Sequence, residues 1–223
     1  MRTINVTGSS KISVKPTLMT LSMEISGDTK TFDESVRKST NETETFKEII
    51  EDLGFKRSDL KTKKLDIDTR TESYRDKYNN YRHRFAGYSY THKMFLEFPE
   101  DNKRLGEIIT ALVKSKIEFE FSVSYTIRDS EKKEYMDELI SEAVYDAKKK
   151  AEILAKAAEV ELGDVIKINH SDNIGGYFND NFLDSDCLSK SCTMDYMASD
   201  IEFSVDAKNI ELSDDVDMIW EIK

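Results

Sequence analysis

Three histidines and two cysteines are the residues of this 223-residue chain best suited to acid–base or metal chemistry. The histidines are His83, His92 and His170, and none has a second ligand at the i, i+4 helical spacing or beside a Cys-x2-Cys pair. His92 lies between Tyr90 and Met94 on the apolar side of an alternating run. We therefore expect a hydrogen-bonded core or rim histidine at position 92, in preference to a metal ligand or general base.

The two cysteines, Cys187 and Cys192, lie in a polar segment. Two thiols are too few for a disulfide framework, so two free, reduced thiols are the favoured interpretation. The alternative is a redox-responsive disulfide, which makes this pair a candidate redox site. A metal site built from both thiols and His170 would need a fourth ligand borrowed from an aspartate, so no metal site is predicted.

The known sequence motifs of catalysis and cofactor binding are missing. The chain contains no G-x-S-x-G, Walker-type or G-x-G-x-x-G sequence. The Gly175-Gly176 pair lacks the strand-to-helix context of a phosphate site, and neighbouring acids such as Asp214 and Asp215 are typical of a solvated face. The sequence therefore predicts a protein that is not an enzyme and holds no cofactor.

A run of alternating cations and rings is the most distinctive candidate surface. This composition suits stacking on single-stranded nucleic acid, and it suits a protein interface equally well. It also suits docking onto the acidic C-terminal region of a neighbouring subunit. We favour a solvated or subunit-contacting hairpin over another protein partner, and either of these over nucleic acid. The candidate residues are Tyr74, Arg75, Lys77, Tyr78, Tyr81, Arg82, Arg84 and Phe85.

The charge of the chain is concentrated near its C-terminal end. The formal net charge is −11, and residues 171–223 hold 13 acidic and 3 basic residues, which accounts for −10 of it. A surface of this sign repels phosphate, which counts against a nucleic-acid partner. The first residues run straight into a strand pattern without a signal peptide, and no segment is apolar enough to span a membrane. We therefore expect a cytoplasmic protein without a membrane partner.

The first elements follow from alternation and capping signals. We expect a short strand at 4–6 with a turn at Gly8, then a strand over 12–25 with a bend at Pro16 and an end at Gly27. A helix over 32–53 is then predicted, with a capping box from Thr31 and Glu34 and a stop at Gly54. The inner face expected for this helix is formed by Phe32, Val36, Thr43, Phe46, Ile50 and Leu53.

The later elements complete an α+β pattern. The predicted order is ββαββαβαββ, and its middle part, βαββαβ, is the split βαβ order of ferredoxin-like folds. We expect an antiparallel or mixed sheet with helices packed on one face, extended by a long helix and two C-terminal strands. The predicted ranges are strands at 60–67, 88–98, 117–127, 165–170 and 210–222, a hairpin tip at 70–84, and helices at 101–113 and 130–162.

The domain prediction is a single domain over 1–223. Two subdomains are a possibility, one of about 1–80 with 200–223 and one of about 81–170. The polar, acidic segment 171–199 is interpreted as a mobile loop.

Several short motifs resemble the SIMPL-domain family, also called domain of unknown function 541. The match runs from Ile4 to Ile222, and the alanine-spaced block that ends in a Leu-Gly stop is its most specific part. Two departures are Pro16-Thr17-Leu18-Met19, where the family often has P-D-x-A, and 171–199, which has no family pattern. The matching segments are Ile4-Asn-Val6-Thr-Gly8, Val14-Lys-Pro16, Leu53-Gly54-Phe55, Asp59-Leu60-Lys61-Thr62, Gly87-Tyr88-Ser89-Tyr90, Ala143-x3-Ala147-x3-Ala151-x2-Leu154-Ala155 and Leu162-Gly163-Asp164-Val165.

The resemblance implies a two-part α+β fold and, in some bacterial members, ring- or channel-like homo-oligomers. Bacterial relatives are linked to oxidative-stress tolerance, and many are exported to the periplasm. Animal relatives are associated with signalling through kinase partners. The family has no established catalytic residues, so none are carried over to this chain. We therefore expect a homo-oligomeric interaction or scaffold protein with a possible role in stress, and nucleic-acid binding or redox response are the alternatives.

Overall fold

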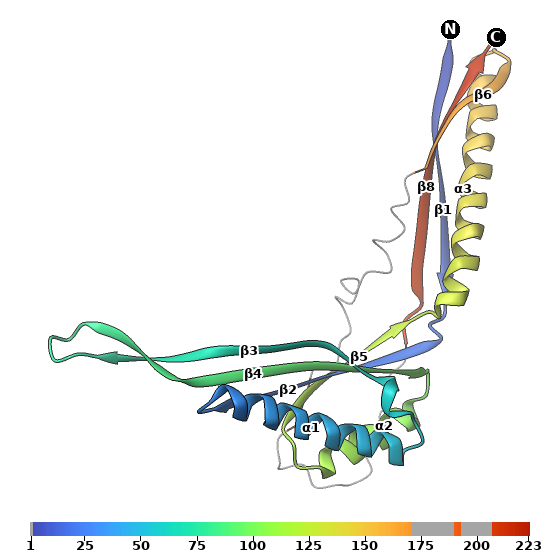
Figure 1. Cartoon of the computed structure of the whole chain (residues 1–223). Coiled ribbons are helices and arrows are strands. Elements are labelled where there is room, and N and C mark those ends of the chain that lie inside the picture. Colours follow the sequence, from blue (N-terminus) through green and yellow to red (C-terminus); the bar gives the residue numbers. More distant parts are fainter. Residues whose placement is uncertain (1, 171–189, 193–206) are drawn as a thin grey trace. The chain divides into compact units, whose positions relative to one another are not determined.

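The computed structural model describes residues 2–170, 190–192 and 207–223 (Figure 1). The chain divides into two compact units, each with its own sheet and hydrophobic core. The first unit comprises the described residues of Met1–Thr17, Thr126–Asp184 and Ala207–Lys223, and the second those of Leu18–Tyr125 and Ser185–Asp206.

The second unit contains the expected ferredoxin-like arrangement. The strands of its sheet lie in the order β3-β4-β2-β5-β7, so the first four have the spatial order that a split βαβ requires. The predicted α+β class is confirmed. In chain order the elements are β2 (Leu18–Thr29), α1 (Phe32–Asp52), a 3-10 turn (Arg57–Asp59), β3 (Leu60–Arg75), β4 (Tyr81–Pro99), α2 (Asn102–Lys114), β5 (Phe119–Thr126) and β7 (Lys190–Cys192).

Helices α1 and α2 cover one face of this sheet (Figure 1). The alternating residues predicted on β4 do face the helices, since Tyr90, His92, Met94, Leu96 and Phe98 are all buried. They pack with β2, β5 and both helices in one apolar cluster. Burying alternate residues of the strands and a stripe of each helix against one another stabilises this layered arrangement.

Helix α1 begins and ends as the sequence indicates. Thr31 Oγ1 accepts a hydrogen bond from the Glu34 N–H at 3.3 Å, and Glu34 Oε2 accepts one from the Thr31 N–H at 3.2 Å. The helix is followed by Gly54 with φ of +87°, a conformation that glycine adopts without strain. The predicted inner face is wrong in the first part of the helix, because Phe32 and Val36 are exposed while Ser35 and Ser39 are buried.

Strands β3 and β4 form a long hairpin with antiparallel pairing from Leu60 opposite Leu96 to Arg75 opposite Tyr81. The register shifts twice along it, once at 62–64 and once at 70–71. The subdomains suggested by the sequence were divided near position 80, which lies between these two strands. Because β3 pairs with β4 along its whole length, both lie in one unit. The two units therefore divide the chain at different positions from the subdomains suggested by the sequence.

The first unit is a three-stranded antiparallel sheet with one helix against it. Its strands lie in the order β1-β8-β6, and α3 packs on β1 and β8. The predicted strand at 210–222 is confirmed, and its even-numbered residues from Leu212 to Trp220 are buried. The elements are β1 (Thr3–Val14), α3 (Asp129–Ala157), β6 (Leu162–His170) and β8 (Ile210–Ile222).

The inner stripe of α3 is made mainly of alanines. Ala143, Ala147 and Ala151, the alanines of the family-like motif, are buried, and their small size lets the helix lie close to the sheet. Leu154 is exposed, whereas Ala155 is buried, so the stripe follows an i, i+4 course at its end. The stripe also includes Leu139, which is buried, whereas Met136, Ile140 and Ala158 are not buried.

Two predictions about strand boundaries are wrong. Strand β1 passes through Gly8 without a turn. The position requires glycine for a different reason, since a Cβ there would lie 2.0 Å from the Ala143 carbonyl oxygen of α3. Strand β2 passes through Gly27, where the Tyr90 ring of the paired strand occupies the space of a side chain. Both glycines therefore permit close packing, and the break between β1 and β2 comes at 15–17, beside Pro16.

Candidate functional site

The candidate surface residues are all found at the end of the β3–β4 hairpin. Pairing between β2 and β4 stops at Thr29 opposite Tyr88, and beyond this point β3 and β4 continue as a two-stranded ribbon (Figure 1). We refer to residues 70–87 of this ribbon as the arm. All eight residues of the predicted cation–ring surface lie in it, so the structure brings them together.

The strand register distributes these residues over two faces of the arm. Residues opposite each other in an antiparallel pair share a face, and successive residues alternate. One face carries Tyr74 opposite Arg82 and Glu72 opposite Arg84. The other face carries Arg75 opposite Tyr81, Ser73 opposite His83 and Thr71 opposite Phe85.

Two arginines near the end of the arm are bound to carboxylates within the arm. Arg84 lies 3.1 Å from Glu72, and its guanidinium also lies over the Tyr74 ring. Arg82 lies 3.3 Å from Asp76.

Among the described residues, the contacts of Arg75 are with neutral groups. It donates to Asn79 Oδ1 at 3.0 Å and to the Tyr81 hydroxyl at 2.8 Å, and it stacks on the Tyr81 ring. These contacts, together with those of Arg82 and Arg84, hold the guanidinium groups in fixed positions along the ribbon.

The rings of the arm are more exposed than is usual for aromatic residues. Tyr78 is 73% exposed, Tyr81 is 69% exposed and Phe85 is 58% exposed. Phe85 meets the Tyr88 ring edge-on at 5.3 Å, and Tyr88 in turn meets Phe32 of α1 at 5.9 Å. A continuous row of rings therefore leads from the start of α1 onto the arm.

Asp76 organises the turn at the end of the arm. Its Oδ1 accepts hydrogen bonds from the N–H groups of Tyr78 and Asn80. The hydrogen bond from Asn80 contributes most to lowering the pKa of the Asp76 carboxyl, and Arg82 adds to the effect. Asn79 has φ of +65°, a conformation that asparagine tolerates better than most residues.

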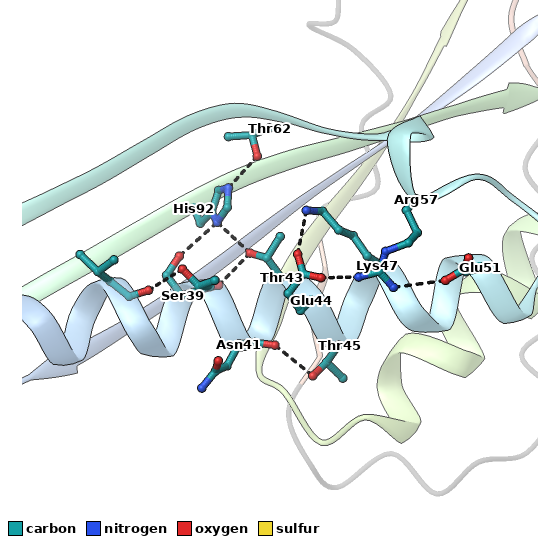
Figure 2. A network of polar contacts seen from close by, with 12 residues as sticks. Ser39, Asn41, Thr43, Glu44, Thr45, Lys47, Glu51, Arg57, Thr62 and His92 are labelled. Carbon is teal, nitrogen blue, oxygen red and sulfur yellow. Dashed lines mark hydrogen bonds and ion pairs between the residues drawn. The ribbon is translucent and has the colours of Figure 1, made fainter.

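His92 lies at the root of the arm in a cluster of hydroxyl groups (Figure 2). Its Nδ1 is 2.9 Å from Thr43 Oγ1 and 3.1 Å from Ser39 Oγ, both on α1. Its Nε2 is 2.9 Å from Thr62 Oγ1 on β3. The side chain is 6% exposed, so the hydrogen-bonded core histidine expected from the sequence is confirmed.

The environment of His92 favours the neutral ring. Burial, and to a smaller extent the positive charge of Lys47, lower the pKa of His92 below its ordinary value. Lys47 itself is bound to Glu44 at 2.9 Å, and Glu44 also pairs with Arg57 (Figure 2). The sequence analysis did not identify the hydroxyl partners of His92. A signal for them existed, because Ser35, Ser39 and Thr43 recur every four residues in line with Phe46 and Ile50.

Tyr90 lies two residues before His92 on the same face of β4. It makes a second buried polar contact with α1. Its hydroxyl donates to Glu42 Oε2 at 2.6 Å. Burial raises the pKa of the Tyr90 hydroxyl far above its usual value near 10, and the Glu42 carboxylate adds to this shift. The ring lies across Gly27 and under the Lys38 ammonium group.

The other histidines lie apart from His92 in the fold. His83 is on the arm, 3.0 Å from Ser73 Oγ. His170 is in the first unit, where its Nε2 is 2.9 Å from Asp214 Oδ2. Asp214, interpreted from the sequence as part of a solvated face, is buried. Asp214 is buried because the side chains of β8 alternate between its two faces, and this position is on the face that packs against α3.

The candidate redox pair cannot be placed as a pair. Cys187 lies outside the described residues, and Cys192 is the last residue of β7, where its backbone pairs with Phe119 of β5. Most of the segment 171–199 also lies outside the described residues. Among the residues that are described, no group of histidine, cysteine and acidic side chains could hold a metal ion. The described helices include none that is long and apolar enough to cross a membrane.

The fold and the arm define an α+β protein with a ferredoxin-like unit, a second unit of three strands and a helix, and an exposed aromatic hairpin. The model of the SIMPL family, described as a protein of unknown function (DUF541), matches residues 4–220. The match spans nearly the whole sequence, so this chain belongs to the SIMPL family, as its motifs indicated. A search of curated proteins finds no match.

Proposed function

We propose that this protein is a non-enzymatic interaction protein that assembles with copies of itself through the arm. The observation that carries this proposal is the exposure of Tyr78, Tyr81 and Phe85 on a ribbon that has no third strand beside it in the part of the chain that the structure describes. A two-stranded ribbon is only marginally stable by itself, and exposed clusters of rings commonly mark interaction sites. A partner that covers the rings would stabilise the ribbon.

The composition of the arm supports a protein partner. Tyrosine and arginine are the residues that most often dominate binding energy at protein interfaces. Arg75 and Arg84 are already stacked on Tyr81 and Tyr74, so less side-chain freedom is lost when a partner binds. The arm therefore offers aromatic contact area together with ordered hydrogen-bond donors.

Charge complementarity supports a second copy of the chain as that partner. The arm contains five basic and two acidic residues, a net charge of +3, whereas residues 171–223 carry −10. Each copy thus supplies both a basic surface and an acidic region of the opposite sign. A role in stress tolerance, which the family resemblance implies, stays a prediction, as does a cytoplasmic location.

Light scattering after size exclusion, at low and high salt, tests this proposal. We expect a discrete oligomer that loosens as salt rises, because exposed charges are screened. The double variant Tyr78→Ser, Tyr81→Ser should shift the protein towards the monomer. A second double variant, Arg82→Ala with Arg84→Ala, should lower the salt sensitivity of whatever oligomer remains.

Tyr145→Ser is the matched control for the tyrosine variants, because Tyr145 is 71% exposed on α3 and lies outside the arm. It should assemble like the natural protein. A monodisperse monomer at every concentration and salt would overturn the proposal. An oligomer that survives the arm variants unchanged would place assembly elsewhere in the chain.

Nucleic-acid binding by the arm is the alternative prediction. The bonds from Arg82 and Arg84 to Asp76 and Glu72 count against it, because phosphate would have to displace these carboxylates. Fluorescence anisotropy with single-stranded RNA and DNA decides the matter. Binding that weakens steeply with salt and is lost in the Arg82→Ala, Arg84→Ala variant would favour nucleic acid over a second copy of the chain.

A redox response through Cys187 and Cys192 also stays a prediction. It requires a reversible disulfide, which intact mass measured after oxidant treatment and thiol blocking would detect. If the two thiols are blocked equally before and after oxidation, the redox hypothesis fails. Cys187→Ser should abolish any change in mass or assembly that oxidant causes in the natural chain.

A further inference from the structure

The buried side chains in the first half of α1 are polar. Its sheet-facing residues are Ser35, Ser39 and Thr43, whereas the second half buries Phe46 and Ile50. Hydroxyl side chains bury little apolar area, so they contribute less to holding a helix on a sheet than large apolar side chains do. The attachment of this half therefore depends strongly on hydrogen bonds.

His92 is the residue that connects these hydroxyls with the hairpin. It belongs to β4, it contacts Ser39 and Thr43 of α1 through one ring nitrogen, and it contacts Thr62 of β3 through the other (Figure 2). A single ring thus links α1 to both strands of the hairpin. The link lies at the root of the arm, on the same face as the buried Tyr90.

The charged groups around His92 do not prepare a place for a charged ring. On α1, Lys47 repels a positive ring, and Glu44 is shared between Lys47 and Arg57. The third nearby charge on this helix, Glu42, accepts a hydrogen bond from the Tyr90 hydroxyl and lies near Lys38. On β3, the contact is the neutral hydroxyl of Thr62. Lys64 and Lys93 lie on the opposite face, where they oppose each other in the register, and they pair with Asp66 and with Glu24 of β2 respectively.

We infer that His92 is a pH-sensitive latch, which in its neutral form holds the first half of α1 on the root of the arm and which loosens when the ring is protonated. A protonated imidazole would be a buried charge beside Lys47 with hydroxyl groups as its only described partners. An opened α1 would let water reach the ring and solvate the charge. Mild acid therefore favours the opened form.

The pH range in which the latch loosens follows from the lowered pKa of His92. An exposed histidine binds its proton near pH 6.5, whereas the pKa of His92 in the closed form is lower. Below pH 6.5 the opened form binds a proton that the closed form does not, so opening becomes more favourable as pH falls. The ratio of opened to closed form rises by at most about tenfold for each pH unit, because opening is coupled to the binding of one proton.

Hydrogen exchange of the full chain at pH 7.5 and 5.5 tests the latch. After correction for intrinsic exchange rates, protection of residues 32–43 should fall by up to about tenfold at the lower pH. His92→Gln keeps a neutral donor and acceptor, so its protection should not change with pH. His83→Gln is the control, since His83 lies on the exposed arm, and it should behave like the natural chain.

A direct titration guards against a His92→Gln variant that fails to fold. The side-chain NMR signals of His92 in the natural chain should titrate below pH 6.5. A pKa at or above 6.5, or pH-independent protection in the natural chain, would overturn the latch. So would a pH-dependent loss of protection that persists in a folded His92→Gln protein.

The latch would also make the proposed assembly depend on pH, because the arm would be held less firmly when α1 opens. This consequence rests on the proposed function, but the exchange and NMR measurements do not. If light scattering finds no oligomer, the latch can still be tested, and if the latch fails, the assembly proposal is unaffected.

Discussion

Gly8 of β1 lies directly against Ala147 of α3, and a Cβ added to Gly8 would come within 2.6 Å of the Ala147 Cβ. The same added atom would lie 2.0 Å from the Ala143 carbonyl oxygen, which is backbone and cannot rotate away. The close approach of α3 to its sheet therefore requires glycine on the strand as well as alanine on the helix.

Gly8→Ala is expected to destabilise the first unit by roughly 3 kcal/mol, because the helix must shift and its alanine stripe loses contacts. Trp220 is the only tryptophan and is buried in the same cluster, so its fluorescence during urea unfolding reports on this unit. Ser9→Ala, at the exposed neighbouring position, should leave the unfolding midpoint nearly unchanged. Equal midpoints for the two variants would contradict this packing argument.

Thr31→Ala should lower the stability of α1 by about 1 kcal/mol, because the N-cap hydroxyl that accepts from the Glu34 N–H is lost. Hydrogen exchange at the start of α1 measures the effect. The control is Thr40→Ala, since Thr40 is exposed in the middle of the helix and bonds only to the Val36 carbonyl among its described contacts. A larger loss of protection in the control would argue against the capping box.

The Tyr90 hydroxyl should stay protonated well above pH 10, because burial and Glu42 raise its pKa. Absorbance at 295 nm should show one of the ten tyrosines ionising late or only on unfolding. As pH rises beyond 10, the unfolded chain loses this proton and the folded chain does not, so stability falls. Tyr90→Phe should remove the late step and cost about 1.5 kcal/mol at neutral pH through the lost bond to Glu42.

His92 is expected to be the Nδ1–H tautomer at neutral pH. Thr43 has one hydroxyl proton, and donating it to the Ser39 carbonyl at 2.8 Å leaves Thr43 Oγ1 free to accept from the ring. Thr62 then donates to the bare Nε2. Long-range nitrogen–proton correlation spectra distinguish the two tautomers, and an Nε2–H pattern would contradict this assignment. Thr62→Val should then destabilise the neutral ring by about 1 kcal/mol, since Nε2 loses its donor.

Short-range patterns in the sequence predicted much of the fold because they report local physics. The alternation of β4 and β8, the capping box of α1 and the glycine that follows it each depend on residues within a few positions of one another. The order of these elements was enough to predict the ferredoxin-like sheet. The cation–ring run likewise predicted that its residues would gather at one hairpin end, because both strands adjoin the same turn.

The sequence by itself thus determined the α+β class, the family and the position of the aromatic arm. Only the tertiary structure decided that Gly8 and Gly27 are sites of close packing, because a glycine in a turn and one under a helix or ring look alike along the chain. It also decided the partners of His92, since Thr43 and Thr62 lie 49 and 30 residues away and meet the ring only when α1 and β3 pack on β4. A hydrogen bond requires two groups within about 3 Å, and folding alone brings groups so distant in sequence to that separation.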